Sequence, residues 1–502
     1  MRPFALVVLV VALASPVAVV QGQQPEATPG YYFMVGRHLE SEGKIDEAIA
    51  AHRRAIALAP DSAELRAELA GLYARQDRPR EAIETAEAAL QRDPDNREAN
   101  RILGSVYAAL SEQKKPLRPG DDPSQYASRA LAALTKARRD GTVDVSLELM
   151  LGRLHLQAGH TGEAIASLRR VVQDQPGYPE AAMLLAAAQS GAGDDEAAMR
   201  TLESAVRQNP SFFRGQVRLA ELYGEAHRYK EAADAYGAAQ ALTRADLTRQ
   251  RASALLNAGD PAAARDLVQK ALERKPNGAD AVLLYLLGQA QRQLKDTSGA
   301  NLTAQKLRTA FPDDPRGPYL GAQLLVDAGR NRDALAAFQD LITRAPDNAS
   351  LVYEYADLLE KNGRPQEAER ALRDLLSKDP LDAVALNSLG YMFAERGERL
   401  DESVDLVQRA LKVEPGNPSF LDSLGWAYFR QGRLDLAEAP LAEAAARLPR
   451  SSAVQDHLGD LRVMQQRYSD AVAAWERALA GDLASIDRAT VEKKIRDARA
   501  RK

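Results

Sequence analysis

One pattern recurs three times between residues 383 and 479, and its period constrains the fold more than any other feature of the chain. In each copy a glycine follows a leucine within an apolar segment, at Gly390, Gly425 and Gly459. The first interval exceeds the second by a single position, because one extra residue lies in a turn near 396–400. A period of about 34 residues is typical of helix-turn-helix units that stack into a solenoid.

Small residues stand where the two helices of each copy are expected to cross. Gly425 in the first helix and Ala437 in the second allow close approach, while Leu424 and Leu441 fill the space between successive pairs. Pro449 follows the second helix and ends it, since proline has a fixed φ and no N–H donor. A single pair cannot bury its apolar face, so stability is expected to come from stacking on neighbouring pairs.

The same period extends back almost to the beginning of the chain. Prolines close most units in the same register, and a second series of small residues marks the second helices. The sequence therefore predicts an all-α solenoid of about thirteen helix pairs over residues 31–485. The small residues of the first helices are Gly36, Ala70, Gly104, Gly152, Ala186, Ala220, Ala252, Gly288, Ala322, Ala356, Gly390, Gly425 and Gly459.

Two departures from the period mark places of interest. Extra residues in the third unit lie within 111–124, where three prolines and a glycine predict a protruding loop without helix. Such an insertion is either part of a binding face or a tolerated surface loop. The register also slips near 240–246, which either bends or divides the solenoid or has no consequence. We accordingly separate repeats 1–6 (31–244) from repeats 7–13 (245–485).

The last segment, 486–502, is expected to form one more helix. Val491, Ile495 and Ala498 lie along one side, and basic residues occupy the other. Terminal repeats need a polar outer face, so we interpret this segment as a capping helix. A basic helix that binds a membrane surface is the alternative.

The segment 1–22 has the pattern of a secretory signal. A short positive start precedes an apolar run, which passes into the polar leader 23–30. The alternative is an uncleaved anchor, since residues 4–20 are nearly long enough to span a bilayer. We expect the mature chain to be extracytoplasmic and, in a bacterium, periplasmic. The absence of cysteine excludes disulfides, thiolate zinc sites and an N-terminal lipidated Cys.

Composition and motifs do not favour an enzyme or a nucleic-acid-binding protein. The net charge is −4, and no basic stripe is interleaved with aromatic residues. His155 and His160 are five residues apart, which is the wrong spacing for two ligands on one helical face. The chain has no His-Glu-x-x-His, Gly-x-Ser-x-Gly or phosphate-binding Gly-x-x-x-x-Gly-Lys motif. We expect no catalysis, no cofactor, no metal and no small-molecule substrate.

Because small, aromatic and proline positions keep one register, the chain resembles the tetratricopeptide repeat (TPR) family. The resemblance implies a right-handed superhelix whose first helices line a concave groove. The groove positions lie three residues before the small residue and one and four residues after it. Carried onto the last three repeats, they are Asn387, Tyr391 and Ala394; Asp422, Trp426 and Phe429; and Asp456, Asp460 and Val463.

Exposed aromatic side chains beside acidic ones suggest a strip that anchors peptides. The predicted groove site comprises Asn387, Tyr391, Asp422, Trp426, Phe429, Asp456 and Asp460. Chaperone-binding members of the family have basic and amide residues at such positions, so a basic or neutral segment is the expected ligand here. The alternative is that Trp426 and Phe429 pack against the flanking repeat as ordinary core.

The last three repeats also resemble the C-terminal part of bacterial envelope TPR lipoproteins. Some of these proteins are adaptors for carboxyl-terminal processing proteases, and others support polysaccharide export. The resemblance implies a non-catalytic scaffold that binds proteins or peptides, with an envelope protease or a secretion complex among its partners. The alternative is a structural component of an envelope export or polysaccharide-secretion complex. An enzyme and a self-assembling structural protein stay open as other classes.

Overall fold

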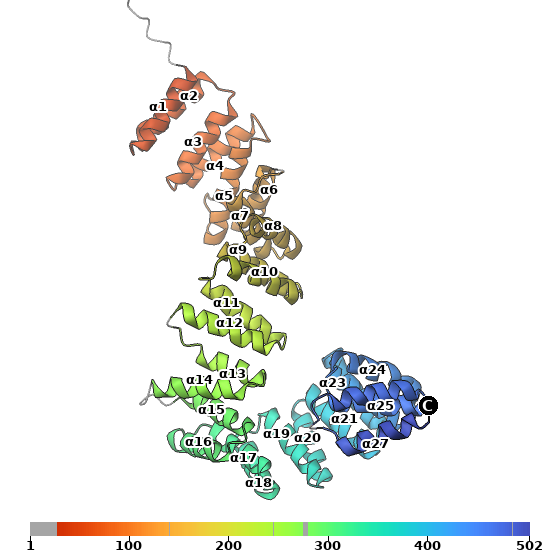
Figure 1. The fold of residues 1–502 in the computed structure, drawn as a ribbon. Helices are drawn as coiled ribbons and strands as arrows, with labels where there is room; N and C mark the ends of the chain where they lie inside the picture. Colours follow the sequence, from red (N-terminus) through yellow and green to blue (C-terminus); the bar gives the residue numbers. More distant parts are fainter. Residues whose placement is uncertain (1–27, 140, 244, 275–279, 484, 502) are drawn as a thin grey trace, which may run out of the picture. The chain divides into compact units, whose positions relative to one another are not determined.

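The computed structural model describes residues 28–139, 141–243, 245–274, 280–483 and 485–501 (Figure 1). Within these ranges the regular structure is helical throughout, with 27 α-helices, one short 3₁₀ helix and no strand. Helices α1 to α26 form thirteen consecutive pairs, and α27 follows them. The predicted all-α fold of thirteen pairs and a final helix is therefore confirmed. The predicted signal segment lies outside the described residues.

The chain forms two compact units, one up to Ala254 and one from Leu255 onward. The division falls within α13, just after the predicted register slip. The paired helices of the first unit are α1 (Pro29–Ser41) and α2 (Ile45–Leu58), α3 (Ala63–Arg75) and α4 (Pro79–Leu90), α5 (Arg97–Gln113) and α6 (Tyr126–Ala137), α7 (Val145–Gln157) and α8 (Thr161–Asp174), α9 (Pro179–Gly191) and α10 (Asp195–Gln208), and α11 (Phe213–Glu225) and α12 (Tyr229–Leu242).

Helix α13 (Thr248–Asn257) contains the boundary between the units and is followed by α14 (Pro261–Glu273). In Figure 1 the later pairs follow one another in chain order up to the C-terminal helix. They are α15 (Ala281–Gln293) and α16 (Thr297–Ala310), α17 (Arg316–Asp327) and α18 (Asn331–Arg344), α19 (Ala349–Lys361) and α20 (Pro365–Lys378), α21 (Ala383–Arg396) and α22 (Leu400–Val413), α23 (Pro418–Arg430) and α24 (Leu434–Arg447), and α25 (Ser452–Met464) and α26 (Tyr468–Leu479), followed by α27 (Arg488–Arg499).

The helices of a pair cross at the small residues that set the period. A Cβ atom added to Gly425 would lie 2.5 Å from Leu441 Cγ and 3.0 Å from the Leu441 backbone nitrogen. Ala437 and Leu441 are fully buried on the opposite helix. The close approach is therefore made against backbone as well as side chain, and a larger residue cannot be accommodated by a rotamer change alone.

Turn chemistry separates the two helices of each pair. Helix α21 ends at Gly397, which has φ of 69° and a backbone N–H bonded to the Ala394 carbonyl. Helix α21 begins after Asp382, whose carboxylate accepts the backbone N–H of Ala385. A left-handed glycine and an acidic N-cap are the usual helix end and start signals.

The insertion in the third repeat differs from its prediction. Helix α5 continues to Gln113, so residues 111–113 are helical because the first proline of the insertion comes only at Pro116. Residues Pro123–Gln125 form the short 3₁₀ helix η1, so the expected absence of helix is wrong there as well. The rest of the loop is held against the neighbouring helices. Arg80 of α4 donates two hydrogen bonds to the Leu117 carbonyl, at 2.9 and 2.6 Å, and Tyr126 Oη accepts the Leu117 N–H at 2.9 Å. Only part of the loop is therefore free to protrude.

One buried ion cluster stabilises the first unit. Glu148 on α7 is only 1% exposed. Its carboxylate lies 2.7 Å from Arg138 Nη2, at the end of α6, and 3.1 Å from Arg170 Nε on α8. Arg138 also donates to the Ser167 hydroxyl at 2.9 Å. One carboxylate thus links three consecutive elements.

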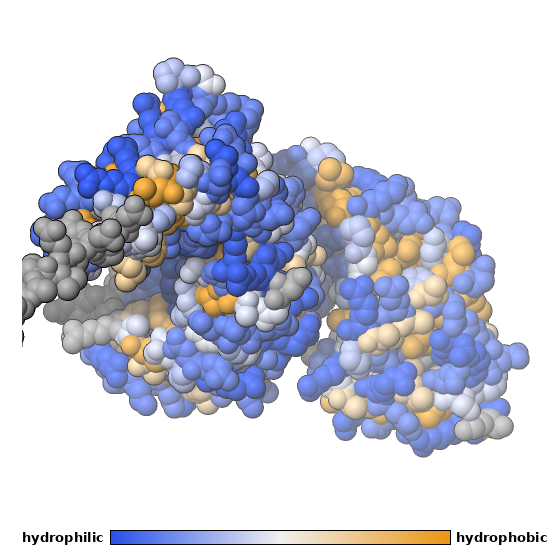
Figure 2. All heavy atoms as spheres, turned by 90° about the horizontal axis from the view of Figure 1, so that it is seen from above, coloured by the Kyte–Doolittle hydropathy of each residue, from blue (hydrophilic) through white to orange (hydrophobic). Residues whose placement is uncertain are grey.

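Hydrophilic residues cover most of the face drawn in Figure 2, and apolar residues appear there as patches between them. None of the helices in the described part of the chain is long and apolar enough to cross a membrane. Helix α27 buries Val491, Ile495 and Ala498 in a cluster with Trp475 of α26. Its other side is exposed and basic, as predicted for a capping helix.

Candidate protein-binding groove

The predicted groove residues separate into two cavities with a buried layer between them. Each cavity lies beside consecutive first helices of the second unit. The residues that line a cavity are Asn387, Tyr391, Phe429 and Asp460. Asp422 and Trp426 are buried, and Asp456 is engaged by a residue of α27. The structure therefore distributes the seven residues over three consecutive first helices without exposing all of them.

The first cavity, which we call the α19–α21 cavity, has a volume of about 450 Å³. Helix α19 contributes the three positions that the register assigns to the groove around Ala356, and α21 contributes two of the equivalent positions around Gly390, Asn387 and Tyr391, whereas the third, Ala394, is buried. The lining residues are Tyr353, Ala356, Asp357, Glu360, Lys361, Leu372, Asn387, Ser388, Tyr391, Met392, Glu395 and Arg396. Apolar and aromatic walls with a few convergent polar groups are typical of ligand sites.

Two tyrosines of this cavity lie near acidic residues. Tyr353 Oη donates to Asp382 at 2.6 Å, so α19 is tied to the first residue before α21. Burial raises the pKa of Tyr391, and the nearby carboxylates of Glu395 and Asp422 raise it further. Both tyrosines therefore line the cavity with neutral hydroxyls.

A buried aromatic stack separates the two cavities. The Trp426 ring lies parallel to the His457 ring, with centroids 4.1 Å apart, and to the Phe429 ring, with centroids 4.9 Å apart. His457 on α25 donates from Nδ1 to the Asp422 carboxylate on α23, at 3.1 Å. The stack thus joins two consecutive first helices through both ring contact and an ion pair.

The expectation that Trp426 is an exposed anchor is wrong, because its side chain is only 8% exposed. Asp422 is buried as well, since His457 covers it. Phe429 is half-buried and keeps one face open to the second cavity. At Trp426, the position one residue after the small glycine is therefore covered by the His457 ring of the next first helix.

Electrostatics favour the charged form of His457. Burial alone would lower the pKa of His457, but the Asp422 carboxylate outweighs it, with Glu395 and Asp456 adding to the effect. The net result is a raised pKa, so the ring carries a proton under mildly acidic conditions. The Asp422–His457 pair is thus a buried ion pair beneath the groove surface.

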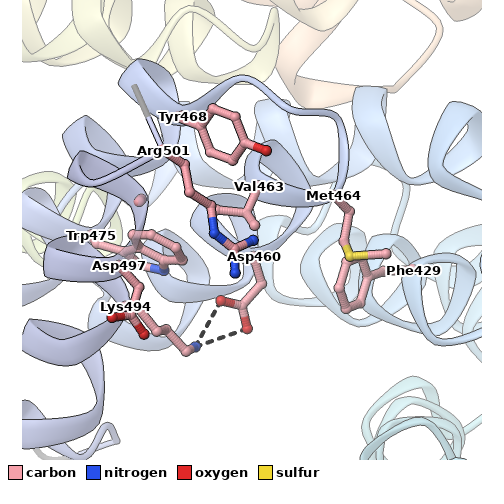
Figure 3. Close-up of a pocket in the computed structure, with 10 residues that line it drawn as sticks. Phe429, Asp460, Val463, Met464, Tyr468, Trp475, Lys494, Asp497 and Arg501 are labelled. Carbon is pink, nitrogen blue, oxygen red and sulfur yellow. Dashed lines mark hydrogen bonds and ion pairs between the residues drawn. The ribbon is translucent and has the colours of Figure 1, made fainter.

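The second cavity, which we call the α25–α27 cavity, has a volume of about 280 Å³ and is drawn in Figure 3. Met464 lies beside Phe429 on one side of the view, and Trp475 and Lys494 lie on the other. The exposed thioether of Met464 gives this cavity an adaptable apolar wall. Its lining residues are Phe429, Asp460, Val463, Met464, Tyr468, Trp475, Lys494, Asp497, Ala498 and Arg501.

The carboxylates predicted for the last repeat are occupied by the chain itself. Lys494 Nζ lies 2.9 Å from Asp456 and 2.7 Å from Asp460, as the dashed lines to Asp460 in Figure 3 show. The ammonium also lies 5.8 Å from the centroid of the Trp475 ring. Burial lowers the pKa of Lys494, but the two carboxylates outweigh it and raise the pKa. Helix α27 therefore supplies the cation that the acidic groove positions require.

Sequence reasoning missed four residues that shape this region. His457 was not selected because its partner lies in the preceding repeat, 35 residues earlier. Lys494 lies 34 residues after Asp460, so the repeat period itself was the signal that could have paired them. Asp357 and Glu360 were not selected because groove positions were assigned only in the last three repeats, and these residues belong to an earlier one.

The chemistry of the region supports binding more than reaction. No cluster of three or more His, Asp or Glu side chains in the described ranges could hold a metal ion. The His457 ring is paired through Nδ1 with the Asp422 carboxylate and stacked against Trp426. Rigid aromatic walls and carboxylates instead form a surface suited to peptide side chains.

Comparison with known families agrees with the helical pairs. One tetratricopeptide repeat model matches residues 217–279, 249–315, 319–383, 356–412 and 394–453. A second tetratricopeptide repeat model matches residues 39–106 and 155–216. Together the matches cover more than half of the sequence. The fold and the groove define a helical-repeat protein, and the chain belongs to the tetratricopeptide repeat family.

Two curated relatives are similar over parts of the chain. A TPR repeat-containing protein of Pseudomonas aeruginosa is 44% identical over 79 residues, which is 16% of this chain and 13% of the relative. Cellulose synthase operon protein C of Pseudomonas fluorescens is 27% identical over 267 residues, 49% of this chain and 20% of the relative. The matches thus span a small part of the relatives' own length.

Among solved structures, yeast Tom70 is similar with a TM-score of 0.42 and 15% sequence identity. The match covers 94% of this chain and 95% of Tom70.

Proposed function

We propose that this chain is a non-catalytic scaffold that binds segments of other proteins along the first helices of its C-terminal repeats. One observation carries the proposal: two cavities open beside consecutive first helices, and residues at the predicted groove positions line both of them. Family membership supports the same interpretation, because TPR proteins generally bind other proteins. The signal-like segment 1–22 supports an extracytoplasmic, periplasmic location.

Affinity capture with matched variants tests this function. The variant Tyr391→Ala/Phe429→Ala removes one aromatic wall from each cavity. The control Leu302→Ala/Val413→Ala removes two exposed apolar side chains from second helices, away from both cavities. The groove variant is expected to lose most envelope proteins that wild type captures, and the control is expected to keep them. Retention of every partner by the groove variant contradicts the proposal.

A structural role in an envelope export or polysaccharide-secretion complex is the second candidate. The similarity over half of this chain to a relative named cellulose synthase operon protein C favours it. Such a component is expected to co-purify with a stable membrane complex in fixed stoichiometry. Capture of exchanging soluble partners supports the scaffold instead. Both candidates predict no turnover by the isolated chain.

A further inference from the structure

The α19–α21 cavity carries more negative charge than its own cations neutralise. Asp357 is paired with Lys361, at 2.6 Å. Glu360 has Arg396 as its nearest cation, but the two are 3.8 Å apart. Arg396 Nε and Nη2 are buried without a hydrogen-bond partner, so this ion pair is not closed by hydrogen bonds.

Glu395 adds a further carboxylate at the rim of the same cavity. Its side chain is exposed, and its charge helps to raise the pKa of the Tyr391 hydroxyl. Within residues 280–483 no lysine or arginine lies at ion-pair distance from the Glu395 carboxylate. Burial raises the pKa of Glu360; Arg396 opposes the rise, and the carboxylates of Glu398 and Asp357 add to it. The three lining carboxylates thus face only two lining cations, Lys361 and Arg396, and one negative charge is left without a cation.

In the last repeat, the chain itself supplies a cation to the acidic groove positions. There Lys494 lies between Asp456 and Asp460, and its ammonium faces the Trp475 ring. Lys494 is one repeat period beyond Asp460, at a separation of 34 residues. The α19–α21 cavity has Asp357 at the position equivalent to Asp460.

The residue that corresponds to Lys494 in the α19–α21 cavity is not a cation. Tyr391 follows Asp357 by the same interval. The following first helix thus provides an aromatic wall where α27 provides an ammonium. Among the described residues, no third cation lines this cavity beside Lys361 and Arg396, so a further cation would come from a bound partner.

We propose that a lysine or arginine side chain of a bound protein segment enters the α19–α21 cavity. Its aliphatic stem packs along Tyr353 and Tyr391, and its charged head meets Asp357 and Glu360. Aromatic rings beside a cation add a favourable quadrupole interaction. This inference rests on the proposed function and specifies its ligand as a segment with a basic residue among apolar ones.

Selection from a peptide library tests the inference. A random decapeptide library displayed on phage is selected against the full chain, against Asp357→Asn/Glu360→Gln, and against the control Asp405→Asn/Asp435→Asn. Both variants remove the same formal charge from the second unit, and the control residues are exposed on second helices. Circular dichroism verifies that all three proteins fold.

The wild type and the control are expected to select peptides with a basic residue at one fixed position. Binding of these peptides, measured by fluorescence anisotropy, is expected to weaken about tenfold in Asp357→Asn/Glu360→Gln. Equal weakening in the two variants overturns the inference, because the attraction is then general. If Tyr391→Ala abolishes binding of selected peptides that lack a basic residue, the inference fails and the proposed function stands. If no selected peptide depends on the cavity, both fail.

Discussion

Replacing Gly425 by alanine tests whether the helix crossing depends on the absence of a side chain. In an open helix interior this change stabilises by about 1 kcal/mol, because glycine has the higher conformational entropy. Here the added Cβ would lie 2.5 Å from Leu441 Cγ and 3.0 Å from the Leu441 backbone nitrogen. Overpacking of this kind costs about 1–3 kcal/mol, and backbone cannot move aside as a side chain can. We expect a net loss of about 1 kcal/mol.

Tryptophan fluorescence during urea unfolding measures the effect locally. The chain has two tryptophans, Trp426 and Trp475, and both lie in the last two repeats. Since repeat arrays unfold in parts, their emission reports these repeats. A loss of about 1 kcal/mol lowers the urea midpoint by roughly 0.3–1 M.

Gly162→Ala is the matched control, because a Cβ at this helical position meets nothing within 4 Å. We expect this variant to be as stable as wild type or more stable, as measured by circular dichroism. A Gly425→Ala chain that unfolds at the same urea concentration as wild type, or at a higher one, refutes the crossing argument.

Three further predictions concern charged groups. The pKa of His457 is raised in the folded state, so its protonation contributes stability that is complete below the unfolded-state pKa near 6.5 and is lost as pH rises through the folded-state pKa. The urea midpoint reported by tryptophan fluorescence should therefore fall as the pH is raised from 6 to 9. An equal fall in His457→Gln would contradict this explanation. Glu148→Ala leaves Arg138 and Arg170 without their shared carboxylate and should lower the free energy of unfolding by about 2–4 kcal/mol, which is measured as a lower melting temperature. An unchanged melting temperature would show that the cluster does not stabilise the fold. Lys494→Met should loosen α27 and speed its cleavage by trypsin, whereas the exposed Lys493→Met should not; similar cleavage of both variants would exclude the proposed anchoring.

The fold was predictable because small residues and helix-ending prolines recur with the same repeat period along the chain. Gly425 and Ala437 indicate a close crossing, and proline ends the second helices, so each unit defines its own geometry. The segment 111–124 was expected to lack helix, but both of its ends are helical, since α5 continues until shortly before Pro116 and a 3₁₀ helix spans Pro123–Gln125.

The groove was less predictable, because exposure of a first-helix residue depends on what the next repeat presents to it. Trp426 is buried because His457 stacks on it, and Asp460 is paired because α27 provides Lys494. Neither partner is evident from the residue and its own helix. Residues that lie about one repeat period apart are candidates for such contacts, and side-chain packing decides which of these contacts form.

Site-specific photocrosslinking in living cells tests the central claim most directly. A photoreactive residue in place of Asn387 faces the α19–α21 cavity, and one in place of Asp405 lies on an exposed second helix. The proposed scaffold predicts discrete protein adducts from position 387 that Tyr391→Ala removes, with few or none from position 405. Equal adducts from both positions, or none from position 387, would contradict a binding groove on the first helices.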